Sequence, residues 1–233
     1  MIAGLQKLTL LDFPGKVACT VFLAGCNYRC PFCHNAELFC GKPEMLMSEE
    51  AFFAFLQSRK GLLEGVCISG GEPTLTPSLE AFAQTIKDMG FALKLDTNGS
   101  RPQILKALAQ KGLLDYVAMD VKSSREGYAA ATGVDADLDA VEESLRFLID
   151  GDLPYELRTT LVDQLHSDTT IEAMGRWLSS LVPGKIPTNL YLQSFVDRDT
   201  VVFSGLTAPT ENTVLHYQKC LAPFVTNVTI RNT

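Results

Sequence analysis

Short apolar runs alternate with segments of helical periodicity along most of the chain. Most of the runs are continuous instead of alternating with polar residues, which is typical of parallel strands covered on both faces. They predict six strands and a further strand-like run near the end, at Val17–Leu23, Gly65–Ser69, Ala92–Asp96, Tyr116–Val121, Tyr155–Val162, Asn189–Phe195 and Val225–Ile230.

Helices are predicted between these strands from capping residues and periodicity. Ser48 is placed to cap Glu49–Arg59, and Thr76-Pro77 reads as the cap and first position of a helix over Ser78–Met89. Asp168 is expected to cap a helix that runs through Ser180. The remaining predicted helices are Arg101–Gln110, Leu138–Ile149 and Glu211–Leu221.

The succession of six β/α units predicts one α/β domain over residues 1–233. Its core would span about 17–196, with a C-terminal helix and strand within 197–233. Since a complete eight-unit barrel averages ~250 residues, six units indicate a partial (βα)6 TIM-like barrel that is open on one side.

Composition narrows the classes of protein. The chain is 46% hydrophobic and 20% charged, an ordinary globular composition. Its net charge of -7 argues against a nucleic-acid partner, which would require a basic surface. No apolar run approaches the ~20 residues that cross a bilayer, and the N-terminus lacks the layout of a signal peptide. We therefore expect a cytoplasmic protein without a membrane partner.

Three of the seven cysteines, Cys26, Cys30 and Cys33, follow the first predicted strand at the spacing C-x3-C-x2-C. Three thiolates on one loop can share a metal ion or an iron–sulfur cluster. An ordinary 4Fe–4S cluster takes four cysteine ligands, so three would leave one iron open to a substrate. The cysteine loop, residues 26–33, is therefore the candidate centre of the site.

The other cysteines and a zinc site are weaker candidates. Cys19 and Cys67 lie in apolar runs and are predicted to be buried structural thiols. Cys40 is a rival ligand, but a turn-like segment follows it and seven residues separate it from Cys33. Zinc with His34 as fourth ligand is disfavoured, because neighbouring residues seldom reach one tetrahedral ion and no second pair of ligands exists. His34 is predicted to be structural.

Polar residues recur where the predicted strands end, which is the edge where parallel α/β folds place their chemistry. Scattered polar residues would not recur at one edge, so this placement predicts a functional site. After the cysteine loop, the residues in question are Gly70-Gly71-Glu72-Pro73, Asp96-Thr97-Asn98-Gly99, Asp120, Lys122, Arg158 and Gln193.

Several of these residues also have a plainer interpretation. Gly70–Pro73 could be an ordinary strand-to-helix turn, and Asp96 and Asp120 could cap the following loops or hold a cation. Lys122 beside Asp120 could form a salt bridge of ~0–1 kcal/mol. Arg158 needs an anionic partner when covered, and a glutamate two residues earlier could supply it.

Taken together, the motifs resemble those of the radical S-adenosylmethionine (SAM) superfamily: the three cysteines, an aromatic residue before the third, and Gly-Gly-Glu-Pro. Within it the chain is most similar to the activating enzymes of glycyl radical enzymes, above all the activating protein of anaerobic ribonucleoside-triphosphate reductase. The likeness spans roughly residues 8–196 and rests on Asp12–Gly15, Phe22–Asn27, Cys33–Asn35, Leu95–Gly99, Met119–Lys122 and Glu156–Thr160.

The resemblance implies a radical SAM barrel with a 4Fe–4S cluster on the three cysteines and SAM on the fourth iron. Phe32 would lie near the adenine, and the Gly-Gly-Glu turn near the methionine amino group. A monovalent cation would lie at Asp96, Thr97 and Asp120, and Val196 replaces a histidine that contacts SAM in one such activase. The implied SAM-binding residues are Phe32, Asn35, Gly70, Gly71, Glu72, Asp96, Asn98, Asp120, Lys122 and Arg158.

The implied reaction is reductive cleavage of SAM to methionine and a 5′-deoxyadenosyl radical, which removes a hydrogen atom from a glycine Cα of a partner enzyme. The expected partner is anaerobic ribonucleotide reductase, with a flavodoxin or ferredoxin as electron donor and anaerobic conditions throughout. The alternatives are activation of another glycyl radical enzyme such as pyruvate formate-lyase, radical modification of a small molecule, and a non-catalytic iron–sulfur or zinc-binding protein.

Overall fold

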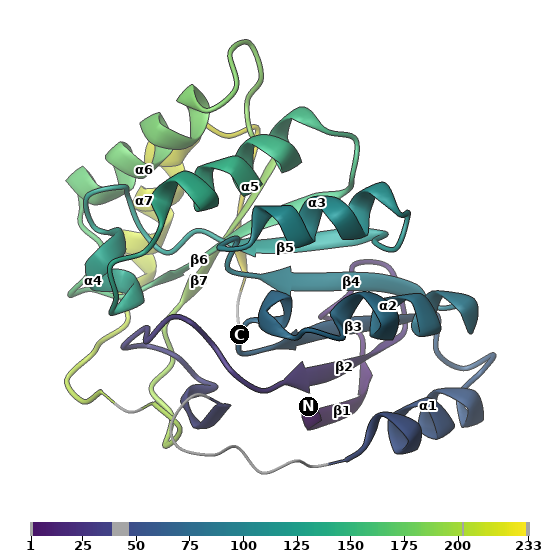
Figure 1. The fold of residues 1–233 in the computed structure, drawn as a ribbon. Helices are drawn as coiled ribbons and strands as arrows, with labels where there is room; N and C mark the ends of the chain where they lie inside the picture. Colours follow the sequence, from purple (N-terminus) through teal and green to yellow (C-terminus); the bar gives the residue numbers. More distant parts are fainter. Residues whose placement is uncertain (1, 39–46, 202, 232–233) are drawn as a thin grey trace. The chain divides into compact units, whose positions relative to one another are not determined.

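The computed structural model describes residues 2–38, 47–201 and 203–231, which form two compact units (Figure 1). The N-terminal unit comprises Met1–Asn27, Asn35–Thr97 and Gln103–Ala118. The C-terminal unit comprises Tyr28–His34, Asn98–Pro102 and Met119–Thr233. Strand β5 (Tyr116–Asp120) carries the chain from the first unit into the second.

The N-terminal unit is built on the strands β1 (Ile2–Thr9), β2 (Ala18–Leu23), β3 (Gly65–Gly70) and β4 (Ala92–Thr97), which neighbour one another in this order. β1 is antiparallel to β2, whereas β2, β3 and β4 are parallel. The last residues of β2 and β3 are register partners, so the loops after both strands begin at the same edge.

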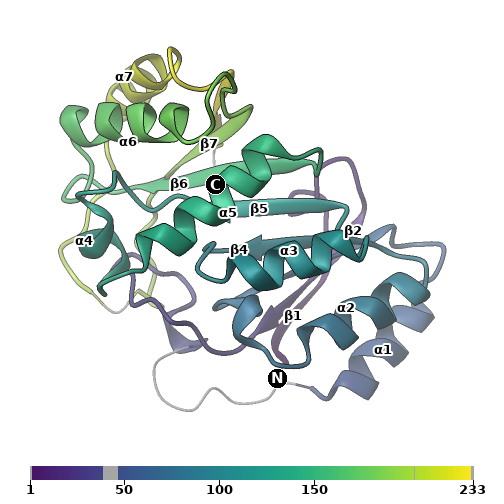
Figure 2. The same cartoon turned by 45° about the horizontal axis from the view of Figure 1, so that its top comes forward.

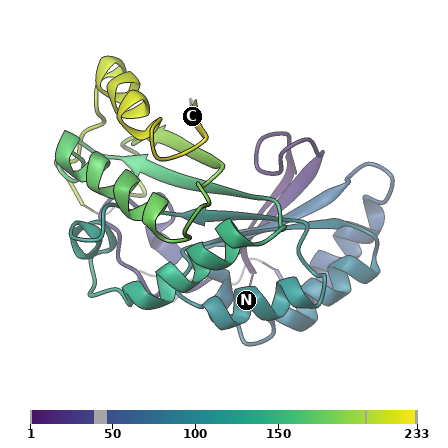
Figure 3. The same cartoon turned by 90° about the horizontal axis from the view of Figure 1, so that it is seen from above.

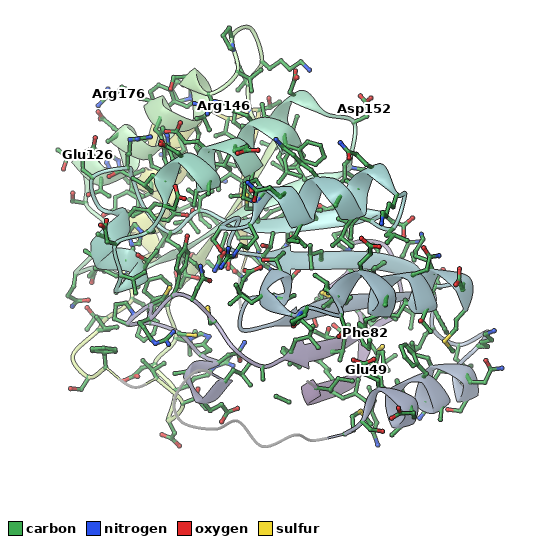
Figure 4. All side chains as sticks on the ribbon, viewed as in Figure 1. Glu49, Phe82, Glu126, Arg146, Asp152 and Arg176 are labelled. Carbon is green, nitrogen blue, oxygen red and sulfur yellow. The ribbon has the colours of Figure 1, made fainter. Side chains whose placement is uncertain are left out.

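Two longer helices of this unit, α1 (Glu49–Ser58) and α2 (Leu79–Asp88), lie along one face of its strands (Figure 3). Ser48 caps α1, because its side chain accepts the backbone N–H of Ala51. Phe82 of α2, labelled in Figure 4, stacks on Phe52 of α1 with 5.4 Å between ring centroids. The helices following the N-terminal strands are η1 (Ala36–Leu38), α1 (Glu49–Ser58), η2 (Pro73–Leu75), α2 (Leu79–Asp88) and α3 (Pro102–Gln110).

The C-terminal unit contains the parallel strands β6 (Tyr155–Leu161), β7 (Asn189–Ser194) and β8 (Asn227–Arg231), which pair in this order. Its helices α6 (Asp168–Ser180) and α7 (Glu211–Leu221) lie side by side (Figure 2), and Gly175 of α6 lets Phe224 approach closely. The elements are α4 (Tyr128–Thr132), α5 (Leu138–Asp150), β6 (Tyr155–Leu161), α6 (Asp168–Ser180), β7 (Asn189–Ser194), α7 (Glu211–Leu221) and β8 (Asn227–Arg231).

The predicted α/β fold class with parallel strands is confirmed. β2 to β7 fall on the six predicted strands, and β8 falls on the last strand-like run. The apolar runs form the core, and Cys19 and Cys67 are fully buried as predicted. Burial raises the pKa of the Cys19 thiol to about 12, which suits an inert structural residue. Within the described residues, no helix is both long and apolar enough to span a bilayer.

The structure corrects two local predictions and adds the strand β1, for which there was no prediction. The α2 helix begins at Leu79 instead of following Thr76-Pro77, because Thr76 closes the short turn η2. Ser167, and not Asp168, caps α6, since its side chain accepts the N–H of Thr170.

Candidate functional site

In the N-terminal unit, the segment that opens the cysteine loop packs against the turn after β3. The Gly71 N–H donates to the Leu23 carbonyl (2.9 Å) and the Glu72 N–H to the Gly25 carbonyl (2.7 Å). A Cβ at Gly70, whose φ is +123°, would collide with the backbone of Leu23, and a Cβ at Gly71 would collide with the Gly25 carbonyl. The two glycines therefore permit direct backbone contact between the turn and residues 23–25, which lead into the cysteine loop.

We expect Gly71→Ala to disturb the position of Cys26, because the new methyl group would meet the Gly25 carbonyl and the Cys26 Cβ. Overpacking of this kind typically costs about 1–3 kcal/mol in the free energy of unfolding. Iron bound per chain after anaerobic reconstitution should fall below half of the wild-type value. Gly61→Ala is the control for a strained glycine away from the cysteine loop, because φ is +82° there but no heavy atom lies within 4 Å of a Cβ. Equal iron loading of the two variants would contradict this prediction.

The carboxylate of Glu72 is buried and caps the short helix η2. Its Oε1 accepts hydrogen bonds from the Thr74 N–H (3.1 Å), the Thr74 hydroxyl (2.5 Å) and the Thr97 hydroxyl (2.7 Å). These bonds tie the Gly-Gly-Glu turn to the end of β4. These hydrogen bonds support the interpretation of Gly70–Pro73 as a strand-to-helix turn. A contact between Glu72 and SAM stays a prediction.

Asp96 on β4 is surrounded by donors from its own unit. The Lys94 ammonium lies 3.0 Å from Oδ1, and the Ser69 hydroxyl donates to Oδ2 at 3.1 Å. The Cys67 thiol is 3.5 Å from Oδ1. Nearby, the Asn35 side-chain amide donates to the Gly70 carbonyl at 3.4 Å, at the end of β3. These contacts fix a polar group at the C-terminal ends of β3 and β4.

The second half of the cysteine loop belongs to the C-terminal unit and is held by α4. The Arg29 N–H donates to the Thr132 carbonyl (2.7 Å), and the Cys33 N–H to the Cys30 carbonyl (3.1 Å), which makes a tight turn. Gly133 ends α4 in the left-handed region at φ +68°. A Cβ there would collide with the Arg29 carbonyl, so the glycine cap also permits this close approach.

Opposite charges gather beside Cys30 in the same unit. Asp120 accepts from Lys122 Nζ (2.8 Å) and Arg158 Nε (2.9 Å), and Lys122 Nζ lies 5.9 Å from the Phe32 ring centroid. Burial raises the pKa of the Cys30 thiol, and the Lys122 ammonium opposes this rise. Burial alone would lower the pKa of Lys122, but the charge and hydrogen bond of Asp120 together with the charge of the Cys30 thiolate outweigh burial, and the pKa is raised. The ammonium therefore stays charged.

Glu156 and Asn98, two further polar residues of this unit, have partners of their own. Glu156, the alternative partner for Arg158, instead pairs with Arg231 at 2.9 Å. Asn98 is buried, and its side-chain oxygen accepts the Ser100 N–H at 2.9 Å. Asn98 thus shapes the loop after β4.

His34 connects the cysteine loop to the segment after β7. Its Nε2–H donates to the Val196 carbonyl at 2.7 Å, and its ring stacks on Phe195 with 5.9 Å between centroids. Burial lowers the pKa of His34, so the ring is neutral. His34 therefore has a structural role, through its contact with the backbone of Val196.

Sequence reasoning missed His166, a buried residue that holds the backbone of Lys122. Its Nδ1 accepts the Val162 N–H (3.0 Å), and its Nε2–H donates to the Lys122 carbonyl (3.1 Å). A histidine in a polar loop with no motif around it gives no sequence signal for this role. His166 therefore joins the ends of β5 and β6.

We expect His166 to make the stability of the cluster-free protein depend on pH. Burial lowers its pKa below the ordinary 6.5, so the unfolded chain takes up a proton that the folded chain does not. The stabilisation is complete above pH 6.5 and is lost as the pH falls below that value, by at most about 1.4 kcal/mol per pH unit. Urea unfolding at several pH values should show that the free energy of unfolding changes less steeply with pH in His166→Gln than in the wild type. Identical slopes would contradict the prediction.

The predicted site residues form two groups, one in each unit. Cys40 lies outside the described residues. Among the residues that the structure describes, no three Cys, His, Asp or Glu side chains are close enough to hold a metal ion together. The N-terminal group is Cys26, Asn35, Gly70, Gly71, Glu72, Asp96 and Thr97, and the C-terminal group is Cys30, Phe32, Cys33, Asn98, Asp120, Lys122 and Arg158.

Known proteins resemble this chain in sequence, both as a family and as individual relatives. The family description "Radical SAM superfamily" matches residues 20–176. A Methanocaldococcus jannaschii protein that carries the name glycyl-radical enzyme activating enzyme is 30% identical over 241 aligned positions, which cover 99% of this chain and 95% of that protein. A Thermococcus kodakarensis protein named GTP 3′,8-cyclase is 35% identical over 147 residues, but these cover 60% of this chain and 46% of the relative.

A solved structure shows the same fold. SuiB of Streptococcus suis, crystallised with S-adenosylmethionine, superposes with a TM-score of 0.67 at 11% identity. The superposition covers 92% of this chain and 51% of SuiB.

Proposed function

Because the chain belongs to the radical SAM superfamily, whose members bind a 4Fe–4S cluster and SAM, we propose that it is an activase that generates a glycyl radical on a partner enzyme. Family membership makes it an enzyme of radical chemistry. The observation that carries the finer proposal is the likeness to the M. jannaschii relative, which extends over nearly the full length of both chains.

Three thiols of the cysteine loop would ligate the cluster. The donors fit, because Cys26, Cys30 and Cys33 place three thiols within eight residues, and metal ligation uses the thiolate form. Burial raises the pKa of the Cys30 thiol, and the Lys122 ammonium opposes this rise. When bound and reduced by an external donor, the cluster would supply one electron to SAM, and SAM would supply a 5′-deoxyadenosyl radical with methionine as the other product.

The groups at the strand ends would bind SAM. The Gly70–Gly71 turn brings backbone close to the cysteine loop, Phe32 offers an aromatic face, and Lys122 and Arg158 offer cations to a carboxylate. Each of these side chains is already fixed by the contacts described above. The proposed SAM-binding set is Phe32, Asn35, Gly70, Gly71, Glu72, Asp96, Asn98, Asp120, Lys122 and Arg158.

We place anaerobic ribonucleoside-triphosphate reductase first among partners, with a flavodoxin or ferredoxin as electron donor, in the cytoplasm. The motif segments around the cysteine loop and strand ends support this choice. The likeness to the GTP 3′,8-cyclase spans less than half of that relative, so it favours the proposed activity less. A thiol-ligated reduced cluster also suits a reducing, anaerobic compartment.

The test incubates reduced, cluster-loaded protein anaerobically with SAM and the reductase, with a pyruvate formate-lyase reaction in parallel. We expect 5′-deoxyadenosine together with a glycyl radical signal by electron paramagnetic resonance on the reductase. A signal on pyruvate formate-lyase alone would identify that enzyme as the partner instead of the reductase and would leave the proposed reaction unchanged. Absence of 5′-deoxyadenosine in every reaction would favour a non-catalytic iron–sulfur or zinc-binding protein.

A further inference from the structure

Lys94 is a buried cation on β4. Its side chain is 2% exposed, and its ammonium lies 2.5 Å from the Asp12 carbonyl oxygen and 3.0 Å from Asp96 Oδ1. The Tyr116 ring lies 5.9 Å from Nζ. A buried ammonium without such partners would be strongly unfavourable, so this position is built around the charge.

Lys94 shares one face of the sheet with the residues around Asp96. Residues two apart on a strand point to the same side, which places Lys94 with Asp96. Cys67 is the register partner of Lys94 on β3, and the Cys67 thiol and Ser69 hydroxyl both reach the Asp96 carboxylate. The carboxylate of Asp96 is thus oriented by groups of its own unit, and Lys94 supplies the cation among them.

The residues present do not fit a monovalent cation at these carboxylates. Asp96 already has the Lys94 ammonium at 3.0 Å. Asp120, described within its own unit, has Lys122 and Arg158 within 2.9 Å. The Thr97 hydroxyl donates its hydrogen bond to the Glu72 carboxylate. A metal cation at either carboxylate would be repelled by an ammonium or guanidinium group a few ångströms away.

We infer that Lys94 is a positioning residue that takes the place of a bound monovalent cation at Asp96. It balances the charge of Asp96 and fixes its orientation. SAM binding by this chain is then independent of K⁺ and Na⁺, and this last statement rests on the proposed function.

The first measurement uses the wild-type protein, reconstituted with its cluster. Equilibrium dialysis gives the dissociation constant of SAM in KCl, NaCl and tetramethylammonium chloride at equal ionic strength. Tetramethylammonium is too large to replace a metal cation among carboxylate oxygens. We expect the three constants to agree within a factor of about 2, and SAM binding about tenfold tighter in K⁺ or Na⁺ would overturn the inference.

The second measurement compares variants in the cluster-free protein. Lys94→Met removes the charge and leaves a carboxylate able to take up a cation, so its melting temperature should rise in KCl relative to tetramethylammonium chloride. The wild type and Lys94→Arg should show no such difference. Lys111→Met is the matched control, because Lys111 forms an exposed ion pair with Glu80.

The outcomes separate this inference from the proposed function. A K⁺-specific rise in the melting temperature of the wild type would overturn the inference without reference to SAM. If Lys94→Met does not fold, the wild-type and Lys94→Arg melting curves still decide the question. If the wild type binds no SAM in any salt, the proposed function fails, while the melting curves still test the role of Lys94.

Discussion

Cys30→Ala will reduce SAM cleavage to background and lower the iron bound per chain. The substitution removes one of three thiolate ligands, and residues 26–33 contain no further cysteine to replace it. Cys30 is also the thiol that the Lys122 ammonium stabilises in its ionised form. The measurements are iron and sulfide per chain after anaerobic reconstitution, and 5′-deoxyadenosine formed with dithionite as reductant.

Cys220→Ala is the control for this experiment. Cys220 is a partly exposed thiol on α7, and its Sγ lies 3.5 Å from His216. We expect wild-type iron content and wild-type SAM cleavage for this variant. If Cys30→Ala retained both properties, the cysteine loop would not be the cluster site.

Asp120→Asn will lower both the stability of the protein and its affinity for SAM. The carboxylate balances Lys122 and Arg158, whose side chains are 16% and 17% exposed, and its removal leaves two poorly hydrated cations together. The side chain of Asp120 is 29% exposed, so water screens part of this effect. We expect a loss of about 2 kcal/mol in the free energy of unfolding and about a tenfold rise in the dissociation constant of SAM.

Asp139→Asn is the matched control, because the Asp139 side chain is 92% exposed and 3.6 Å from Arg125. Urea unfolding and equilibrium dialysis should leave this variant close to the wild type. A stability loss that is equal in the two variants would show that Asp120 is an ordinary surface carboxylate.

The strands could be predicted because their buried positions are continuous in the sequence. β3 has four buried residues in a row, and a continuous apolar run of this kind is typical of a parallel strand that is covered on both faces. β1 escaped prediction because most of its residues are exposed or half-buried, as expected for an antiparallel strand that pairs with β2 alone among the described strands. Composition gives no signal for such a strand.

The position of the site could be predicted, but the partners of its side chains could not. Strand ends and cysteine spacing are local properties, so the sequence placed the candidate residues. Lys94 instead contacts a carbonyl 82 residues earlier, and His166 contacts one 44 residues earlier. Glu72 was assigned to a ligand, whereas the fold also uses it as a cap, and a carboxylate suits both roles.

The close backbone contact between the Gly70–Gly71 turn and residues 23–25, just before the cysteine loop, has a consequence for the iron-free protein. The two hydrogen bonds that hold the turn use protein atoms alone, so this part of the site keeps its shape when a chelator removes the metal. The amide hydrogens of Gly71 and Glu72 should therefore exchange slowly with deuterium in the apoprotein. Cluster assembly then acts on a folded chain, and a damaged cluster can be rebuilt without a cycle of unfolding and refolding.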